Sequence, residues 1–351
     1  MAVDFFKKFV DDLGDPDTAL AAEGKSSSEF CGFIDTGSYT LNVAVSGSLF
    51  GGIPNNKGIV LAGDPSTGKT FFALGIIKHF LASNPRARVF YFDTESAVTN
   101  QMMTDRSIDP SRVAKAEPET LEKFRTTAHK VLDEFGKLEE EDRFPLLIVL
   151  DSLSMLPSSK EIADTVEGKE VKDMTKPGLI KGIFRVLRLK MAKLQVGYIV
   201  TNHVYAVIGA YVPTKEVAGG SGAKYAADTL LFLSKSKEKD DEKHVIGNVI
   251  KIHTVKARLA REETKVETRI MYDGGLDRHY GLLSFAVDAG IVKKLGSRYE
   301  WPDGTKAFEK AILKAPEKFY TTDILTKLDE YMKPLFTYTP GVSVDTEDTD
   351  E

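Results

Sequence analysis

Residues 58–70 read GIVLAGDPSTGKT and join an apolar run to a glycine-rich loop. Residues 58–62 are apolar without alternation, which is typical of a strand buried on both faces. Residues 63–70 match the pattern G-x-x-x-x-G-K-[ST], in which backbone N–H groups converge on phosphate oxygens at the N-terminus of the next helix. The stretch therefore predicts a strand, a phosphate-binding loop and a helix, and with them a site for a nucleoside triphosphate.

The loop motif assigns roles to its own residues. Lys69 is expected to reach the β- and γ-phosphates, and the Thr70 hydroxyl is expected to hold Mg²⁺. Asp151 ends a later apolar run, where a carboxylate can fix the water shell of the metal or cap the next turn. The nucleotide-binding residues predicted in this way are Gly63, Asp64, Pro65, Ser66, Thr67, Gly68, Lys69, Thr70 and Asp151.

Another strand end carries the candidate catalytic carboxylates. Residues 92–95 read Phe-Asp-Thr-Glu and follow the strand expected at 89–92. A carboxylate at this edge can orient and activate a water molecule for in-line attack on the γ-phosphate. Glu95 is the first candidate for that role and Asp93 is the competing one. The alternative is an exposed acid without a catalytic function.

Apolar strands alternate with helices on both sides of the loop. Strands are expected at 58–62, 89–92, 146–150 and 196–201, and helices at 70–81, 121–135 and 179–194. This order is typical of right-handed βαβ units around a mostly parallel sheet, so the predicted fold class is α/β. Further strands are expected at 229–234, 249–255 and 266–272, the last two antiparallel.

The two ends of the chain differ from this central region. Residues 3–13 place apolar side chains on one helical stripe, and the linker up to residue 29 allows that helix to dock on a neighbouring copy or on its own domain. Residues 278–340 predict a small C-terminal region with helices near 281–290, 306–314 and 322–333. Residues 341–351 contain five acids and no base, which predicts a disordered acidic tail.

Composition and charge exclude several classes of protein. The chain has 351 residues, one Cys and a net charge of −5, which excludes a disulfide framework and whole-protein attraction to nucleic acid. No apolar run is long enough to span a membrane and no secretory signal is evident, so a cytoplasmic location is expected. Residues 174–215, however, contain no Asp or Glu and seven Lys and Arg residues. This basic segment predicts either an anion-binding surface or a solvated helix face.

Several motifs together resemble the RecA family of homologous recombinases, and within it the phage UvsX-type branch. They are the loop at 63–70, the Asp-Thr-Glu at 93–95, the Asp-Ser-Leu at 151–153, the Asn-His at 202–203, the Asp-Met-Thr at 173–175, the segment GGSGAKY at 219–225 and the segment DGGLD at 273–277. The resemblance covers roughly residues 30–300. It implies a RecA-like P-loop ATPase core at 30–277, with residues 1–29 serving oligomerisation.

The resemblance also implies roles for residues outside the loop. Glu95 would activate the attacking water, and His203 would sense the γ-phosphate where many members have Gln. Lys256 and Arg258 would reach across a filament interface to the neighbour's γ-phosphate, as an arginine finger does. A basic strand edge is the alternative for this pair of cations.

Two loops of such a recombinase line the filament axis, and they would lie at about 158–176 and 205–222. The DNA-binding residues implied are Lys176, Lys181, Arg185, Ile208, Gly219, Gly220 and Lys224, with Ile208 wedged between bases. The implied function is an ATP-dependent, Mg²⁺-requiring recombinase that forms helical filaments on single-stranded DNA, exchanges strands with duplex DNA, and works with a single-strand-binding protein and a loading mediator in the host cytoplasm. A hexameric helicase of the same fold and an ATP-regulated scaffold are the alternatives.

Overall fold

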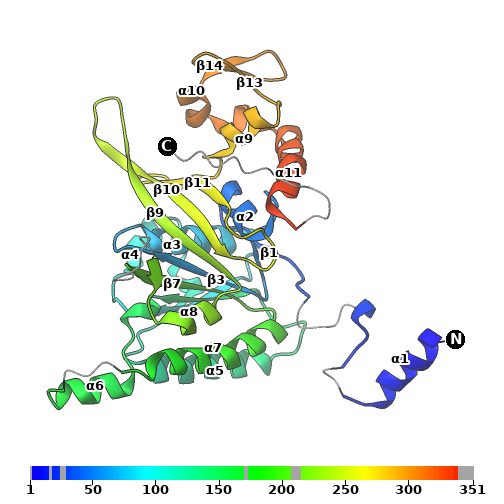
Figure 1. Ribbon diagram of the computed structural model, residues 1–351, viewed down its shortest axis with the longest axis vertical. Helices are drawn as coiled ribbons and strands as arrows, with labels where there is room; N and C mark the ends of the chain where they lie inside the picture. Colours follow the sequence, from blue (N-terminus) through cyan, green and yellow to red (C-terminus); the bar gives the residue numbers. More distant parts are fainter. Residues whose placement is uncertain (1, 16–17, 24–28, 170–172, 207–214, 339–351) are drawn as a thin grey trace.

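The computed structural model describes residues 2–15, 18–23, 29–169, 173–206 and 215–338, and its main feature is one large sheet (Figure 1). The sheet has the strand order β12-β11-β10-β9-β3-β7-β6-β4-β5, and β8 pairs with β7 outside this path. Its strands are β3 (Gly58–Gly63), β4 (Arg88–Asp93), β5 (Val113–Ala116), β6 (Leu146–Asp151), β7 (Gly197–Ala206), β8 (Lys215–Val217), β9 (Thr229–Lys239), β10 (Val245–Lys256), β11 (Lys265–Met271) and β12 (Gly275–Leu276).

The predicted strand that precedes the glycine-rich loop, β3, lies inside a parallel block. It pairs in parallel with β7 on one side and β9 on the other, and β6, β4 and β5 continue the parallel pairing. The strands β10, β11 and β12 extend the sheet in antiparallel fashion. The carboxyl ends of β3, β7, β6 and β4 therefore meet at one edge, and this edge receives the residues that follow them.

Helices cover both faces of the parallel block (Figure 1). On one face lie α2 (Tyr39–Ser46) and α3 (Lys69–Ser83), and on the other lie α5 (Leu121–Gly136), α7 (Lys176–Lys193) and α8 (Gly220–Ala226). Ile59 and Leu61 of β3 join the core on the first face, while Val60 and Ala62 join the core on the second. Double-sided burial explains why the strand is apolar without alternation.

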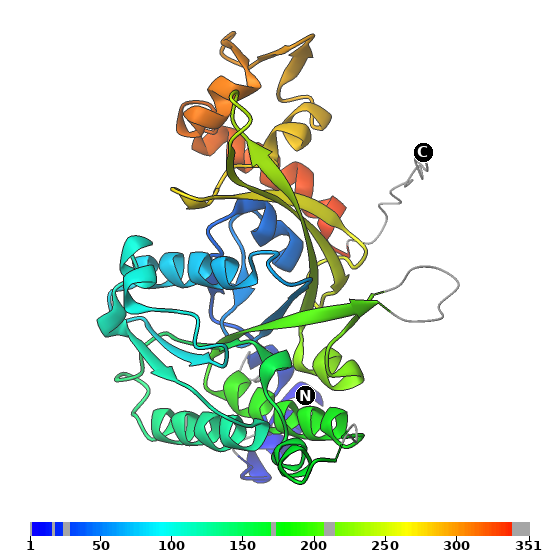
Figure 2. The same ribbon diagram turned by 90° about the vertical axis from the view of Figure 1, so that its left-hand side faces the viewer.

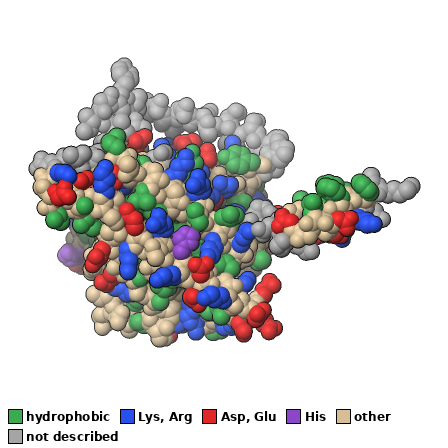
Figure 3. All heavy atoms as spheres, turned by 90° about the horizontal axis from the view of Figure 1, so that it is seen from below, with side chains coloured by type: hydrophobic (Ala, Val, Ile, Leu, Met, Phe, Trp, Pro, Cys, Tyr) green, Lys and Arg blue, Asp and Glu red, His purple; other side chains and the backbone are tan. Residues whose placement is uncertain are grey.

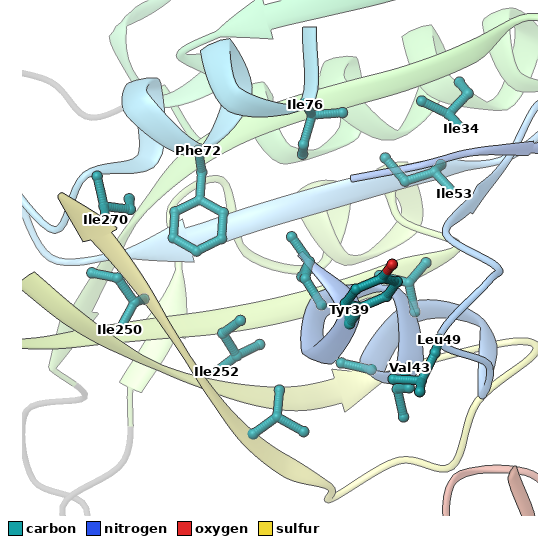
Figure 4. Close-up of a cluster of buried hydrophobic side chains, with 14 of the residues drawn as sticks. Ile34, Tyr39, Val43, Leu49, Ile53, Phe72, Ile76, Ile250, Ile252 and Ile270 are labelled. Atoms are coloured by element: carbon teal, nitrogen blue, oxygen red, sulfur yellow. The ribbon is translucent and has the colours of Figure 1, made fainter. Parts of the chain in front are cut away.

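The first of these cores ties the P-loop helix to the antiparallel strands. Figure 4 shows Phe72 and Ile76 of α3 on the same side of the sheet as Ile250 and Ile270, all of them buried. Each such side chain stabilises the fold by about 2 kcal/mol through the apolar surface that it removes from water. The packing fixes the start of α3, and therefore the loop before it, against β10 and β11.

The remaining elements are shorter. The helices are α1 (Ala2–Asp12), α4 (Asn100–Asp105), α6 (Ser159–Val166), α9 (Leu282–Asp288), α10 (Glu309–Lys314) and α11 (Thr322–Phe336), and 3₁₀ turns lie at Ala21–Glu23, Pro110–Arg112, Leu153–Met155 and Pro316–Lys318. Two small sheets pair β1 (Phe33–Ile34) with β2 (Ile53–Pro54) and join β13 (Lys293–Leu295), β14 (Arg298–Glu300) and β15 (Lys306–Phe308).

The C-terminal region lies beyond the antiparallel strands, on the side away from α5 and α7 (Figure 2). Trp301 is buried within it, and the ion pair between Lys310 and Asp241 joins α10 to the turn between β9 and β10. The helix predicted at 306–314 was placed too early in the chain. Residues 306–308 form β15, and only residues 309–314 are helical. Three-residue strands such as β15 are too short to show a period in the sequence.

The N-terminal helix α1 projects away from the rest of the chain (Figures 1 and 3). The expected apolar stripe is confirmed, and Phe5, Phe6, Phe9 and Leu13 are all exposed, Phe5 by 77%. The acidic segment 341–351 lies outside the described residues. No helix within the described ranges has both the length and the apolar character needed to cross a bilayer.

The two loops expected at 158–176 and 205–222 contain regular structure among the described residues. Helix α6 occupies 159–166, with Ser158 and Glu161 forming a reciprocal cap at its start. In the second loop, β7 continues to residue 206, β8 returns beside it at 215–217, and α8 begins at residue 220. The two predicted loop regions therefore contain short helices and strands at their described ends.

Helix α8 packs against the N-terminal end of α7 through Gly222. A Cβ atom on Gly222 would lie 2.4 Å from the backbone oxygen of Pro177 and 3.1 Å from Cβ of Ile180. A backbone oxygen inside a packed helix pair cannot give way cheaply. Glycine is therefore required at this position by the close approach of the two helices.

We expect Gly222→Ala to lower the free energy of unfolding by about 1–3 kcal/mol, because the added methyl group forces α7 and α8 apart. Gly182→Ala is the matched control, since a Cβ there meets nothing within 4 Å. Alanine in the middle of α7 should raise stability by up to about 1 kcal/mol. Chemical unfolding followed by circular dichroism measures both, and equal effects of the two substitutions would contradict this account of the packing.

Candidate functional site

The glycine-rich loop closes one side of a cavity of about 600 Å³ at the carboxyl edge of the sheet. Gly68 has a φ of 93° and caps α3 in the left-handed conformation, which L side chains adopt at a cost. The Thr67 hydroxyl donates to the Asp64 carbonyl at 2.8 Å, and this hydrogen bond stabilises the turn. The loop residues that line the cavity are Ser66, Thr67, Gly68, Lys69 and Thr70. The predicted loop and the helix N-terminus thus face one hollow.

Lys69 is nearly buried and lies at the centre of this edge. Its Nζ donates to the carbonyl oxygens of Gly63 and Asp64, each at 3.0 Å, and lies 3.3 Å from Nδ1 of His203. Burial lowers the pKa of the Lys69 ammonium, and the carboxylates of Glu95, Asp151 and Asp64 oppose that shift. The ammonium is positioned beside the loop, where a phosphate oxygen can replace a carbonyl as its acceptor.

Asp151 is held in one orientation by two hydroxyl groups. Tyr91 donates to its Oδ2 at 2.7 Å, and Thr201 donates to its Oδ1. Burial, together with the charge of Asp151, raises the pKa of the Tyr91 hydroxyl, which therefore stays a donor. Asp151 and the Thr70 side chain line the same cavity. A carboxylate and a hydroxyl beside a phosphate site fit Mg²⁺, which is usually held by one or two protein oxygens, phosphates and water.

Glu95 faces the same cavity and Asp93 does not. Oε1 of Glu95 accepts a hydrogen bond from the Ser152 hydroxyl at 2.8 Å and lies 3.8 Å from Nε2 of His203. About a third of the Glu95 side chain is exposed, so water can reach it. This carboxylate is therefore placed at the cavity wall with its second oxygen unused by the described residues.

Asp93 has structural partners instead. Its carboxylate pairs with Lys115 at 3.1 Å and accepts the backbone N–H groups of Ala97 and Val98. The side chain is 1% exposed and is absent from the cavity lining. Asp93 therefore anchors the segment between β4 and α4, and the geometry favours Glu95 for the chemistry.

His203 bridges the loop lysine and the candidate base. Its ring lies between Nζ of Lys69 and Oε1 of Glu95. Burial and the positive charge of Lys69 lower the pKa of the imidazole, so the neutral ring is favoured near pH 7. The neighbouring side chain, Asn202, donates to the carbonyl of Ala218 at 2.8 Å, which ties this strand end to the segment leading into α8.

The opposite wall of the cavity comes from elements that the sequence patterns did not assign to it. Arg106 lies over the ring of Phe71 at 4.5 Å from the ring centre, and Tyr272 follows β11 with its ring exposed. Lys235 of β9 donates to the carbonyl of Ser66. These residues come from separate parts of the chain. Among them, Tyr272 alone lies next to a local sequence signal, the glycine-rich segment that follows it.

Lys256 and Arg258 lie far from the nucleotide cavity of their own chain. Ile250 of β10 lines that cavity, and Lys256 is six residues further along the same strand, about 20 Å away. Nζ of Lys256 donates to the carbonyl oxygens of Lys224 and Ala227 at 3.1 and 2.7 Å. These two cations cannot reach the γ-phosphate that their own loop would bind.

The basic segment is partly neutralised by acids from elsewhere in the chain. Lys176 pairs with Glu161 at 2.9 Å, and ion pairs also join Lys190 to Asp133, Arg188 to Asp228 and Lys215 to Asp64. Figure 3, which views the molecule from the side of α5 and α7, shows acidic and basic side chains interspersed on this face. The positive surface is therefore narrower than the composition of residues 174–215 indicates.

Two cations of α7, Lys181 and Arg185, have no ion pair within the described residues and are available to bind an anion. Arg185 is exposed and has no hydrogen bond or ion pair with the part of the chain that the structure describes. Nζ of Lys181 lies 4.2 Å from the ring centre of Tyr225 on α8. Both residues line a second cavity of about 440 Å³, together with Lys57, Arg188 and Tyr225.

The remaining predicted DNA-binding residues surround α8. Gly219 caps this helix with a φ of 81°, and Gly220 follows with a φ of 57°. Lys224 is exposed on the same helix. Ile208 lies outside the described residues. Gly219 and Gly220 therefore shape the entry into α8, and Lys224 adds a cation beside Tyr225.

Comparison with known proteins identifies the family. The family model of the RecA N-terminal domain matches residues 14–277. The chain belongs to the RecA family. The "Recombination and repair protein" of Enterobacteria phage T4 is 29% identical over 254 residues, which cover 72% of this chain and 63% of that relative. "Protein RecA" of Thermotoga maritima is 28% identical over 267 residues, which cover 76% of this chain and 71% of that relative.

Membership of the RecA family confirms the fold class and the resemblance inferred from the motifs. The matched region includes the loop at 63–70 and ends at the last residue of the segment DGGLD at 273–277. The C-terminal region that follows residue 277 lies outside the match. The chain also spans less than two thirds of the length of the phage T4 relative.

Proposed function

We propose that this RecA-family chain is an ATP-dependent recombinase, which forms helical filaments on single-stranded DNA and catalyses homologous pairing and strand exchange. The observation that carries the proposal is the separation of two sets of groups. The loop, Glu95 and Asp151 lie at one edge of the sheet, and Lys256 lies about 20 Å along β10 from Ile250, which lines the nucleotide cavity. A complete site therefore needs two protomers in head-to-tail contact, and such contacts build helical assemblies.

Within one protomer the loop binds ATP and Glu95 directs the water. Residues 66–70 line the cavity, where their backbone N–H groups and the Lys69 ammonium would bind the phosphates, and Thr70 and Asp151 would hold Mg²⁺. The metal, when bound, would neutralise charge on the phosphate oxygens. Glu95 accepts the proton of the attacking water as that water approaches the γ-phosphate in line. His203, between Lys69 and Glu95, responds to the presence of the γ-phosphate.

The neighbouring protomer supplies Lys256 and Arg258. Positive charge next to the transferred phosphoryl group stabilises the charge that develops there in the transition state. Hydrolysis then depends on assembly, because no protomer alone contains both halves of the site. The exposed apolar stripe of α1 provides a second contact between protomers and makes residues 1–29 an oligomerisation element.

Single-stranded DNA would lie along α7 and α8. Lys181 and Arg185, which line the second cavity, are the cations that would contact phosphates, while the ion pair with Glu161 makes Lys176 the weaker candidate. The hydrogen bond from Asn202 to Ala218 connects the γ-phosphate side with the segment that leads into α8. Duplex DNA, a single-strand-binding protein and a loading mediator are the further partners we propose, in the cytoplasm of the host.

The direct test is ATP hydrolysis with and without single-stranded DNA, combined with negative-stain electron microscopy. We expect turnover to rise by at least tenfold on addition of DNA, because DNA assembles the shared sites, and we expect open helical filaments in the images. Closed rings with unwinding activity would contradict the proposal in favour of a helicase. Filaments without turnover would indicate a scaffold.

Replacing Lys181 or Arg185 by Ala should weaken binding to single strands of every sequence alike. Each lost phosphate contact should reduce the slope of log K against log salt by about 0.7. Lys190→Ala is the matched control, since Lys190 lies on the same helix but pairs with Asp133. Fluorescence anisotropy across a salt series measures the slopes, and equal slopes for Arg185→Ala and Lys190→Ala would assign Arg185 to a solvated helix face.

A further inference from the structure

Asp228, between α8 and β9, has a nearly buried carboxylate outside the nucleotide cavity. Its Oδ2 accepts the backbone N–H of Gly58, the first residue of β3, at 3.0 Å. Its Oδ1 faces two guanidinium groups, that of Arg188 on α7 and that of Arg258, whose Nε lies 2.9 Å away. One carboxylate fixed to the strand of the glycine-rich loop therefore holds a cation of α7 and the cation that follows β10.

Arg258 is held by its Nε and not by the two terminal nitrogens. The side chain is 55% exposed, and its terminal nitrogens have no hydrogen-bond or ion-pair partner within the described residues. The guanidinium is planar with donors in a fixed fork, so a carboxylate at Nε sets the direction of the other donors. This arrangement leaves the outer edge of Arg258 free to bind oxygen atoms of a second molecule.

The surroundings of Arg258 are otherwise positive. Lys57, Arg188 and Lys256 lie close enough for Coulomb interactions with Asp228 or Arg258, and burial and the charges of Arg188 and Arg258 lower the pKa of Lys256. Like charges would turn the Arg258 side chain away from this cluster. The negative charge of Asp228 offsets that repulsion and keeps the guanidinium beside β9.

The other members of the cluster are fixed to the end of α8. The carbonyl oxygens of Lys224 and Ala227 accept from Lys256, that of Tyr225 accepts from Arg188, and that of Ala226 accepts from the Tyr198 hydroxyl. These carbonyls form the partially negative end of the helix, where cations are stabilised. The cluster around Asp228 is therefore fixed by side chains of three elements, α7, β7 and β10, and Arg258 is its exposed member.

We infer that Asp228 is a positioning residue, which orients Arg258 toward the γ-phosphate bound by the neighbouring protomer. The inference rests on the proposed function, in which Arg258 acts across an interface. Asp228 itself touches neither ATP nor the attacking water. Loss of the Asp228 carboxylate should displace the Arg258 guanidinium by an ångström or more. A displacement of this size lowers turnover on the order of tenfold to a hundredfold.

An assay that mixes two variant proteins tests this role of Asp228. The substitution Asp228→Asn is introduced on one side of the interface at a time. Asp228→Asn keeps an oxygen that accepts from Gly58 and removes the charge. A Lys69→Ala protein supplies only the finger, and an Arg258→Ala protein supplies only the loop. We expect Asp228→Asn in the finger-supplying protein to lower the turnover of the mixture tenfold or more, and the same substitution in the loop-supplying protein to leave it unchanged.

The outcomes separate the possible failures. An equal loss on both sides, or no loss on either, would overturn the role of Asp228, since a purely structural residue acts on both subunits. Asp228→Glu, which keeps the charge, should recover part of the turnover on the finger side, and the thermal midpoint of each variant checks folding. If the parent mixture without any change at Asp228 shows no turnover above that of its components, the action of Arg258 across the interface is wrong and the inference falls with it.

Discussion

We expect an equal mixture of Lys69→Ala and Arg258→Ala proteins to hydrolyse ATP, on single-stranded DNA, far faster than the sum of the two proteins alone. Each variant lacks one half of every site, and loss of a finger residue costs on the order of a thousandfold. In a randomly mixed head-to-tail assembly, about a quarter of the interfaces join an intact loop to an intact finger. Those interfaces should turn over at close to the normal rate, because the finger acts locally on developing charge.

The measurement is steady-state ATPase activity of the mixture, with co-assembly shown by fluorescence energy transfer between labelled variants. A mixture of Lys69→Ala with Lys69→Ala/Arg258→Ala is the matched control, since it contains no intact loop. If co-assembled proteins give only the sum of their separate activities, Arg258 acts within its own subunit. The distance of about 20 Å along β10 between Ile250, which lines the cavity, and Lys256 argues against that result.

Replacing Glu95 by Gln should lower DNA-dependent kcat by about 10²–10⁴-fold while ATP binding and filament assembly persist. The amide keeps the hydrogen bond with Ser152 but cannot accept the proton of the attacking water. Single-turnover hydrolysis measures the chemical step, and a fluorescent ATP analogue measures binding. A loss of binding that parallels the loss of turnover would make Glu95 a ligand of the nucleotide and not the base.

Asp93→Asn is the control that separates the two neighbouring acids. Asp93 is buried with Lys115 and two backbone N–H groups, so its substitution should cost about 2 kcal/mol of unfolding free energy. The folded fraction should keep most of its kcat. If Asp93→Asn instead stops hydrolysis in a stable protein, the two carboxylates have exchanged the roles assigned here.

The nucleotide edge could be predicted from sequence because its parts follow apolar strands directly. The loop, Glu95 and Asp151 each come at or just after the end of a strand, and parallel strands bring those ends together. His203 lies within β7 but pairs with Gly63, the last residue of β3. The choice between Asp93 and Glu95 could not be made that way. It depends on where Lys115 lies, and this lysine belongs to the edge strand β5, which shows no apolar pattern.

Other features of the fold could not be predicted from the sequence, for physical reasons. Helix α2 is buried on every side from Tyr39 to Val45, so it has no polar stripe to mark it as a helix. The ion pairs that narrow the basic surface join residues up to 151 positions apart, such as Lys215 and Asp64. A count of charges along a segment cannot show partners that the fold supplies from a distance.

The separation of the loop from Lys256 and Arg258 also sets how activity depends on the length of an assembly. In an open stack of n protomers, one terminal protomer presents a loop that no finger completes, and the other presents a finger without a loop. Such a stack contains n − 1 complete sites, so turnover per protomer rises as (n − 1)/n and a pair of protomers works at about half the limiting rate. The two termini are chemically different surfaces, and a molecule that caps the loop-bearing terminus would leave the finger-bearing one open to growth.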